Sequence, residues 1–499
     1  MLSLQQKAPY APHPLALYAH LQGANTLLLE SAQVENKKHT KSIILAKACL
    51  KMTCQNANTR LEALNTNGQA LLGKMAPVLG LEPKEGVLEK HYPKDTSLND
   101  EFSKLKSASP LDALRAVFKS VDTSNTPPFG LFCGGYFGFE FVGAFEDLPH
   151  LEAKDNTAPD FIFFVAQNLI LIDHQAQTTQ IFGSCFDLSL KDQIQSEIDH
   201  LARLNPPPFS PKTHPQNSDL GTNCTDEDFA QIVLATKEQI KQGEIFQAVP
   251  SRSFYLECKE PLSAYHHLKE QNPSPYMFYM QTQDFTLFGA SPESALKYDA
   301  STNLAQIYPI AGTRPRGKNP DGSINLDLDN RLELDLQNDP KERAEHIMLV
   351  DLARNDIARV AKPLSRVVSK LLKVEKFAHV MHLTSAVQGE LKEGLDALHA
   401  YQSFMNAGTL SGAPKIAALK LIATLEGKRR GSYGGSMGYL CADGSMDSCI
   451  IIRAAFVQEG RAVVQTGAGI VLDSVVEAEI AETKAKSKAV ISAILKTHA

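Results

Sequence analysis

The sequence lacks three features that would each define a class of protein: an excess of basic residues, a long apolar run and a pattern of paired cysteines. Its 50 Lys and Arg are outnumbered by 56 Asp and Glu, which gives a net charge of −6. Nucleic-acid binding usually needs a broad basic field, so we expect no nucleic-acid partner. No uninterrupted apolar run approaches the roughly 20 residues that span a bilayer, so we expect no membrane-spanning segment.

The eight cysteines are scattered, and none belongs to a Cys-x-x-Cys pair. This distribution indicates neither a zinc knuckle nor a disulfide framework. The N-terminal stretch MLSLQQKAPYAPHPLALYAH shows no basic segment followed by an apolar run and a small-residue cleavage site. We therefore expect a protein of the reducing cytoplasm.

The glycine motifs of nucleotide-binding proteins are missing as well. GSYGGSMGYL (431–440) and QTGAGIV (465–471) do not match Gly-x-Gly-x-x-Gly at the start of a helix, and GTLSGAPK (408–415) lacks the spacing of a P-loop. This disfavours dinucleotide and nucleoside triphosphate chemistry. The backbone N–H groups of such stretches can instead closely approach a carboxylate or another anion.

The chain is long for one small core, and we expect two unequal parts. The clearest seam is rich in Pro, Ser and Asn, which predicts a linker over 204–224. It divides an N-terminal part, 1–203, from a C-terminal part, 225–499. A fraction of 43% hydrophobic residues is enough to bury a sizeable core.

Patterns typical of strands and helices alternate along the chain. FIFFVAQNLILI (161–172) and RAVVQTGAGIV (461–471) are typical of strands. DFAQIVLATKEQIKQGEIF (228–246) is typical of a long helix. The mixed order predicts an α+β or α/β fold.

Two helical patterns each carry a pair of glutamates three residues apart. KERAEHIMLV contains Glu342 and Glu345, and EAEIAETKAKSKAV contains Glu479 and Glu482. Residues at i and i+3 share one helix face, so each pair can aim two carboxylates at one point. Mg²⁺ prefers oxygen ligands and keeps several waters, which leaves room for an anionic substrate. The spacing alone leaves two interpretations open, a magnesium site or an ordinary solvated helix surface.

Several long motifs follow one another in a fixed order: PIAGTRPRG, EHIMLVDLARND, HVMHLTSAVQGEL, GTLSGAPK, and GAGIVLDS before ETKAKSKA. By these motifs the chain resembles the chorismate-utilising enzymes, and within that family it is most similar to the large subunits of anthranilate synthases. The resemblance is dense over about residues 225–495. It implies an α+β fold, a large composite of antiparallel β-sheets flanked by helices, with a regulatory N-terminal part and a chorismate-binding C-terminal part.

The resemblance implies Mg²⁺ as the cofactor and chorismate as the substrate. Glu345 and Glu482 match direct ligands of the ion, and Glu342 and Glu479 complete the acidic shell through metal-bound water. The ion would hold the ring carboxylate of chorismate and oppose its negative charge.

The same resemblance assigns the substrate contacts. Arg453 and Tyr433 match residues that hold the enolpyruvyl carboxylate, because a guanidinium fork fits a carboxylate at two points. The other expected contacts are the backbone of Gly467, Ala468 and Gly469 and the side chain of Lys486.

Three catalytic roles are implied as well. His382 matches a family histidine that assists departure of the ring hydroxyl, a general-acid role suited to an imidazole that titrates near neutrality. Thr409 and Glu293 match polar contacts near that hydroxyl.

Two positions indicate which reaction of the family to expect. Water-adding members carry an activating lysine where this chain has Gln247, and a glutamine does not act as the base that activates water, so ammonia is the expected nucleophile. Aminodeoxychorismate synthases carry a lysine where this chain has Ala311, which favours direct amination at the ring carbon beside the carboxylate. Elimination of pyruvate would then give anthranilate, at the first step of tryptophan biosynthesis.

LLLES and NPSPYMFY resemble the two segments that form the tryptophan feedback pocket of these enzymes. The expected effector contacts are Leu28, Glu30, Ser31, Pro273, Tyr276 and Met277. Ser31 would hydrogen-bond tryptophan, and the side chains of the second segment would enclose its indole. The complete lack of Trp in this chain agrees with an enzyme that is made when tryptophan is scarce.

No cysteine lies in the tight glycine-flanked turn that a glutamine amidotransferase needs for its nucleophile. We therefore expect a separate glutamine amidotransferase small subunit, component II, as the partner that supplies ammonia. Two alternatives remain open: an aminodeoxyisochorismate synthase, which stops before pyruvate elimination, and a catalytically silent subunit that only binds the effector.

Overall fold

The structure is a computed structural model that describes residues 1–32, 39–94, 100–215, 219–376 and 380–498. Part of the predicted linker, 216–218, and His379 of the HVMHLTSAVQGEL motif lie outside the described residues.

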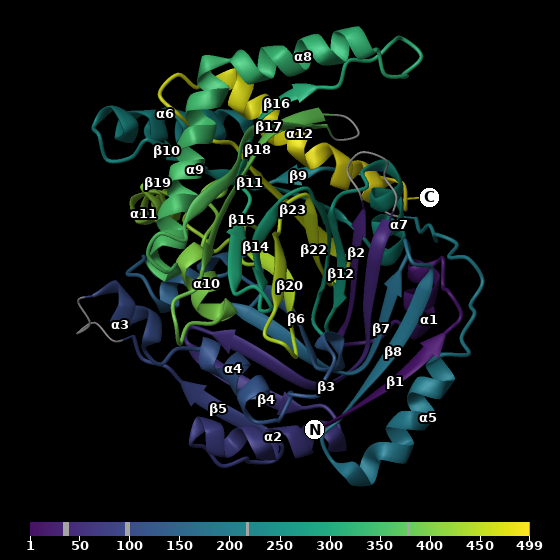
Figure 1. Cartoon of the computed structure of the whole chain (residues 1–499). Helices are drawn as coiled ribbons and strands as arrows, with labels where there is room; N and C mark the ends of the chain where they lie inside the picture. The colour runs from purple at the N-terminus through teal and green to yellow at the C-terminus, as the bar shows by residue number, and fades with distance from the viewer. Residues whose placement is uncertain (33–38, 95–99, 216–218, 377–379, 499) are drawn as a thin grey trace.

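An antiparallel β-assembly of 21 strands forms the centre of the described chain, and helices flank it (Figure 1). The α+β prediction is therefore confirmed. The strands are β1 (Leu2–Ala8), β2 (Thr26–Ala32), β3 (His39–Gln55), β4 (Asn58–Ala63), β5 (Val87–His91), β6 (Phe132–Phe137), β7 (Phe161–Asp173), β8 (Thr178–Cys185), β9 (Gly221–Thr222), β11 (Ser251–Glu257), β12 (Tyr276–Gln281), β13 (Thr286–Ser291), β14 (Ser294–Asp299), β15 (Leu304–Ile307), β16 (Ile310–Pro315), β17 (Val367–Lys376), β18 (Val380–Glu390), β20 (Ser436–Cys441), β21 (Met446–Ile450), β22 (Ala454–Gln458) and β23 (Arg461–Gly467), with the short pair β10 (Gln247–Ala248) and β19 (Gly412–Ala413) apart from them.

The α-helices of the described residues are α1 (Pro14–Leu21), α2 (Thr66–Leu79), α3 (Glu101–Lys106), α4 (Leu111–Lys119), α5 (Lys191–Leu201), α6 (Asp226–Lys241), α7 (Pro261–Gln271), α8 (Leu326–Asn338), α9 (Pro340–Val360), α10 (Ala397–Phe404), α11 (Lys415–Glu426) and α12 (Val476–Leu495). None of them is long and apolar enough to cross a membrane.

The predicted elements match the structure except at their ends. The strand predicted over 161–172 is β7. The helix predicted over 228–246 is α6, which begins earlier because Thr225 and Asp228 form a capping box. It ends at Lys241, just before Gly243 with a φ of 82°. The strand predicted over 461–471 is β23, which ends at Gly467.

Strand pairs cross the seam between the two predicted parts of the chain. β2 pairs with β12, with Glu30 opposite Met277, and β6 pairs with β20, with Gly135 opposite Gly438. A buried cluster also joins apolar side chains of β2, β3, β6 and β7 to those of β12, β13, β20 and β22. The two parts thus share one sheet and one core, and the division of function between them stays a prediction.

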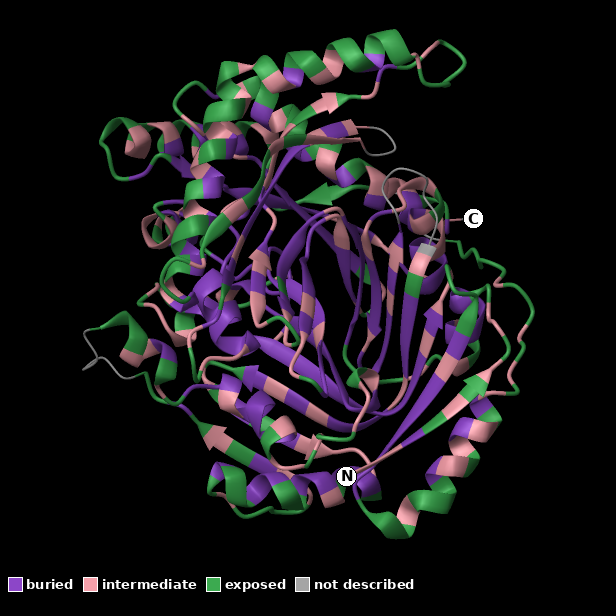
Figure 2. Ribbon diagram, viewed as in Figure 1, coloured by how far each residue is buried: buried purple, intermediate pink, exposed green. Residues whose placement is uncertain are grey.

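Burial follows this arrangement. In Figure 2 the central strands are mostly buried, whereas the outward faces of α2, α5 and α8 are exposed. Helix α9 packs on β16 and β18, and α12 packs on β23 and α7. Helices α9 and α12 are therefore held by different strands of the same assembly.

Candidate active site

The paired glutamates lie on two helices, as predicted, and both pairs are near the beginning of their helix. Pro340 is the first residue of α9, and the Asp339 carboxylate accepts hydrogen bonds from the N–H groups of Lys341 and Glu342. Glu342 and Glu345 follow within two turns, and Glu479 lies in the first turn of α12. Helix N-termini carry partial positive charge, which favours carboxylates there.

The structure brings the two pairs together. Burial, together with the negative charges of Glu342, Glu479 and Glu482, raises the pKa of the Glu345 carboxyl to about 7, while Lys341 opposes this shift. Burial and the charge of Glu482 also raise the pKa of Glu479. Carboxylates that shift each other's pKa in this way lie at one site, although they are more than 130 residues apart in the sequence.

The donor set of this site fits a hard divalent cation. Oε2 of Glu479 is buried and has no hydrogen-bond partner among the described residues, so it offers an unused lone pair. A 2+ ion would also relieve the repulsion that raises the pKa of Glu345. The four carboxylates do not form a closed cage: within the described chain, only His266, His267 and Glu270 bring three ligand atoms within 4.8 Å of one another. An open acidic site suits Mg²⁺, which keeps several of its waters.

Tyr433, in the turn before β20, and Arg453, in the bend between β21 and β22, face the acidic site. Both influence each other's pKa, and Glu482 and Glu293 lie close enough to affect the guanidinium of Arg453. No hydrogen bond or ion pair joins the Arg453 side chain to another residue of the described chain. Its backbone has a φ of 51°, which is strained for a non-glycine residue. A half-buried, unpaired guanidinium held in a strained conformation is suited to receive a carboxylate.

Lys486 connects the helix to the glycine-rich segment after β23. Its Nζ lies 2.5 Å from Oε1 of Glu482 and donates to the carbonyl of Gly467 at 3.1 Å. The N–H of Ala468 donates to the carbonyl of Pro250 at 3.2 Å, so this N–H is already used in the structure. A Cβ on Gly467 would lie 3.1 Å from the hydroxyl of Tyr433, and one on Gly469 would lie 2.8 Å from Nε2 of Gln247. Close packing explains both glycines.

His382 lies on β18 and is joined to the acidic site through Gly312. Its Nδ1 lies 3.0 Å from the carbonyl of Gly312, whose Cα faces Glu342 so closely that a Cβ would come within 3.0 Å of Oε2. Because a carbonyl only accepts, Nδ1 carries the proton. Burial, with the charges of Arg453 and Lys486, lowers the pKa of His382 to about 4. The ring is therefore neutral near pH 7 in this structure, and the expected general-acid role stays a prediction.

Glu293 and Thr409 form a buried polar pair beside these residues. The hydroxyl of Thr409 donates to Oε1 of Glu293 at 2.9 Å. Burial raises the pKa of Glu293 to about 8, although Thr409, Arg453 and Lys486 oppose this shift. At neutral pH the carboxyl therefore keeps its proton and can donate it.

A cavity of about 390 Å³ lies between β2, β12, β20 and β21, and we name it the β2–β12 cavity. It is lined by four residues of the expected effector set, Glu30, Ser31, Tyr276 and Met277. Leu28 and Pro273 are absent from its described lining. Leu28 pairs with Tyr279 and is fully buried in the core.

Sequence reasoning missed the opposite wall of this cavity. Met437, Tyr439 and Asp447 come from β20 and β21, and Oδ1 of Asp447 accepts a hydrogen bond from the hydroxyl of Tyr276 at 3.1 Å. The only local signal for these residues is the strand pattern around GSMGYL, which does not reveal its neighbours. Lys341 was missed for a similar reason, since it resembles an ordinary surface lysine.

The chain belongs to the chorismate binding enzymes, whose family model matches residues 84–492. Over almost its whole length it is similar to particular members of that family. Anthranilate synthase component 1 of Vibrio cholerae serotype O1 is 48% identical over 507 residues, which cover 99% of this chain and 96% of that protein. Anthranilate synthase component 1 of Escherichia coli K12 is 47% identical over 501 residues, with 98% and 96% covered.

A solved structure agrees with these relatives. The crystal structure of anthranilate synthase component I from Streptococcus pneumoniae TIGR4 superimposes with a TM-score of 0.70 at 27% identity and covers 97% of this chain and 99% of that chain. The resemblance inferred from the motifs is thereby confirmed, and the chain is an enzyme of this family.

The raised pKa of Glu293 predicts a pH-dependent loss of stability that Glu293→Gln removes. Between the ordinary value of 4.5 and about 8, the folded protein keeps a proton that the unfolded chain releases. Stability therefore falls as pH rises through this window, and the glutamine variant gains about 3–5 kcal/mol relative to the wild type. Urea unfolding of both proteins at pH 4.5 and 8, without Mg²⁺ or ligand, measures the difference. Parallel pH profiles would contradict the assigned protonation of Glu293.

Proposed function

We propose that this chain is the chorismate-aminating large subunit of an anthranilate synthase. The observation that carries the proposal is the meeting of four glutamates from α9 and α12 with Arg453, Tyr433 and the protonated Glu293 in one site. Such a site has an acidic end, a cationic end and a proton donor. Relatives at 47% and 48% identity over nearly the full length are named anthranilate synthase component 1, which supports the same reaction.

The proposed reaction has two parts. Ammonia forms a bond to the ring carbon beside the carboxylate of chorismate, and the ring hydroxyl leaves as water. The bond to the enolpyruvyl oxygen then breaks, a ring proton is lost, and pyruvate and the aromatic anthranilate are released. One chorismate and one ammonia thus give one anthranilate, one pyruvate and one water.

The residues of this chain supply orientation and proton transfer. Arg453 binds the enolpyruvyl carboxylate at two points, and the hydroxyl of Tyr433 donates to the same group. Glu293, protonated at neutral pH and oriented by Thr409, provides the proton with which the hydroxyl leaves as water. Gln247 lies against Gly469 and contributes no base, in keeping with ammonia as the nucleophile.

The acidic site would hold Mg²⁺ through Glu345 and Glu482, with Glu342 and Glu479 around them. When bound, the ion supplies positive charge that fixes the ring carboxylate of chorismate and offsets its charge. Lys486 bridges Glu482 and the Gly467 carbonyl and so joins this end of the site to the segment after β23.

Ammonia, in this proposal, comes from a separate glutamine amidotransferase subunit, component II, and the complex works in the cytoplasm. The eight cysteines are all buried, so none offers the accessible thiolate of an amidotransferase nucleophile. Supplied with an ammonium salt, the chain should work alone.

Feedback inhibition by tryptophan is the second element of the proposal, with the β2–β12 cavity as its site. Two of the cavity walls, β20 and β21, are paired strands that lead directly to the active site. Tyr433 precedes β20 by three residues, and Arg453 follows β21 by three. An effector that shifts this strand pair would displace both residues that bind the enolpyruvyl carboxylate and weaken chorismate binding.

The function is tested by mixing the purified chain with chorismate, Mg²⁺ and an ammonium salt at mildly alkaline pH. We expect anthranilate fluorescence and equimolar pyruvate, both suppressed by tryptophan. Consumption of chorismate without pyruvate would identify an aminodeoxyisochorismate synthase. Unchanged chorismate would point to a silent effector-binding subunit and contradict the proposal.

Glu345→Gln should weaken the activation by Mg²⁺ about 100-fold or more without unfolding the protein, because it removes a charged ligand but keeps its shape. Glu482→Gln should act in the same way. The control is Glu477→Gln, which removes an equal charge from the first turn of α12 at an exposed position outside the site. Activity and calorimetric titration with Mg²⁺ measure the effect. Equal Mg²⁺ dependence in all three variants would show that Glu345 and Glu482 are ordinary surface charges and not ligands of the ion.

Ser31→Ala and Met277→Ala should each weaken tryptophan inhibition about tenfold, roughly the effect of one hydrogen bond or one apolar contact. Uninhibited turnover should stay unchanged, since neither residue belongs to the active site. Inhibition curves with and without each change measure the shift. Pro273→Ala is the control, because Pro273 is not part of the described lining of the β2–β12 cavity. An equal loss in the control would show that the effector binds elsewhere.

A further inference from the structure

A fully buried arginine stands behind Tyr433. Arg430 belongs to the segment KRRGSYGG after α11 and is 1% exposed. Its guanidinium lies 5.5 Å from the centre of the Tyr433 ring and 4.4 Å from that of Phe139, so it packs between two aromatic faces. The carbonyl of Arg430 also accepts a hydrogen bond from the N–H of Tyr433. Arg430 therefore contacts Tyr433 through both its side chain and its backbone.

The guanidinium also binds the backbone of two other active-site segments. Its Nη1 donates to the carbonyl of Leu410 at 2.8 Å, directly after Thr409. Its Nη2 donates to the carbonyl of Val249 at 2.6 Å, two residues after Gln247. These bonds leave the segments from which Thr409 and Gln247 project attached to one rigid group.

Glu426 fixes the orientation of this arginine. Its carboxylate accepts from Nε and Nη2 of Arg430, with the shorter contact at 2.5 Å, and both side chains are almost completely buried. The same carboxylate accepts from the N–H and the hydroxyl of Ser251, each at 2.8 Å. Ser251 lies opposite Gly467 in the β11–β23 pair, so the network reaches the glycine-rich segment as well.

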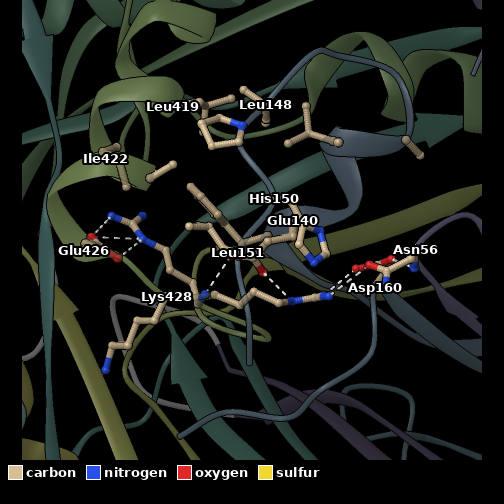
Figure 3. A pocket seen from close by; sticks show the side chains of 18 of the residues that line it. Asn56, Glu140, Leu148, His150, Leu151, Asp160, Leu419, Ile422, Glu426 and Lys428 are labelled. Carbon is tan, nitrogen blue, oxygen red and sulfur yellow. Dashed lines mark hydrogen bonds and ion pairs between the residues drawn. The ribbon is translucent and has the colours of Figure 1, made fainter. Parts of the chain in front are cut away.

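The opposite side of this ion pair faces a cavity. Figure 3 shows Glu426 with its bonds at the edge of a cavity of about 360 Å³, next to Ile422 and Leu419 of α11. Burying two charges costs free energy, and such a pair often adds little net stability compared with apolar residues of the same size. The guanidinium of Arg430 donates hydrogen bonds to the carbonyls of Leu410 and Val249 and packs on Tyr433. Apolar side chains of the same size would make none of these hydrogen bonds.

We propose that Arg430, fixed by Glu426, is a positioning residue for chorismate binding. It places the hydroxyl of Tyr433 toward the enolpyruvyl carboxylate while tying the Thr409 and Gln247 segments into the same frame. The inference rests on the proposed function. It adds a specific residue that never touches the substrate and acts through Tyr433.

The test is Arg430→Lys, which keeps the positive charge but loses the planar, forked set of N–H donors of the guanidinium. We expect the KM for chorismate to rise about 10–100-fold, with kcat changed less than threefold, because the Tyr433 contact serves substrate and transition state alike. The matched control is Arg429→Lys. Arg429 is adjacent, also buried and ion-paired, but the hydrogen bonds of its side chain within the described chain go to Asp160 and Asn56. Its KM should stay within twofold of the wild type.

A double-mutant cycle separates positioning from general support. If Arg430 acts through the Tyr433 hydroxyl, Arg430→Lys should raise KM less than about threefold in a Tyr433→Phe background. Should Arg430→Lys not fold, Glu426→Asp serves instead, since the shorter side chain withdraws its carboxylate from the guanidinium and should produce the same rise in KM.

An unchanged KM in the folded variant, an equal rise for Arg429→Lys, or fully additive effects in the cycle would each overturn the inference. Failure of the proposed function is a distinct result. In that case the wild-type chain would itself not convert chorismate, whereas failure of this inference leaves wild-type turnover intact.

Discussion

Mutual repulsion among four carboxylates is the constraint on which the rest of this site depends. Glu342, Glu345, Glu479 and Glu482 come from two helices, and burial together with the charges of the other three raises the pKa of Glu345 to about 7. The fold tolerates this arrangement because both pairs stand near helix N-termini and because Lys341 and Lys486 lie next to them. The four carboxylates stay close together, despite their repulsion, only because strands hold α9 and α12 in place. The sheet is therefore part of the ion site.

The strands also connect the β2–β12 cavity with the active site. The paired strands β20 and β21 line the β2–β12 cavity at one end and lead to Tyr433 and Arg453 at the other. Glycine makes this pairing dense: a Cβ on Gly438 would come within 2.3 Å of the carbonyl of Asp447. A closely packed strand pair shifts as a unit and does not yield locally, which is how an effector in the β2–β12 cavity would be coupled to the carboxylate site in the proposed function.

The limits of prediction follow from the range of each interaction. Helix periodicity and i, i+3 spacing predicted both glutamate pairs, and the strand pattern predicted β7, because these signals lie within about 20 residues. The meeting of Glu345 with Glu479 needs the whole sheet between them, and only family resemblance suggested it. Arg430 escaped notice because KRRG resembles a solvated basic run. Its burial depends on carbonyls of Leu410 and Val249, which no local pattern reveals.

In the proposed function, the two ends of the site bind the two carboxylates of the substrate with opposite chemistry, and this difference orients the substrate. Chorismate carries two carboxylates, which a symmetric cationic pocket would bind in either direction. In the proposed function, the acidic end binds a carboxylate only through a cation, whereas the other end offers Arg453 directly. A carboxylate without an intervening ion is repelled by the glutamates, so only one orientation is favourable. In the proposed orientation the ring hydroxyl lies within reach of Glu293, a carboxyl whose pKa burial raises to about 8. Binding direction and proton delivery thus follow from one distribution of charge.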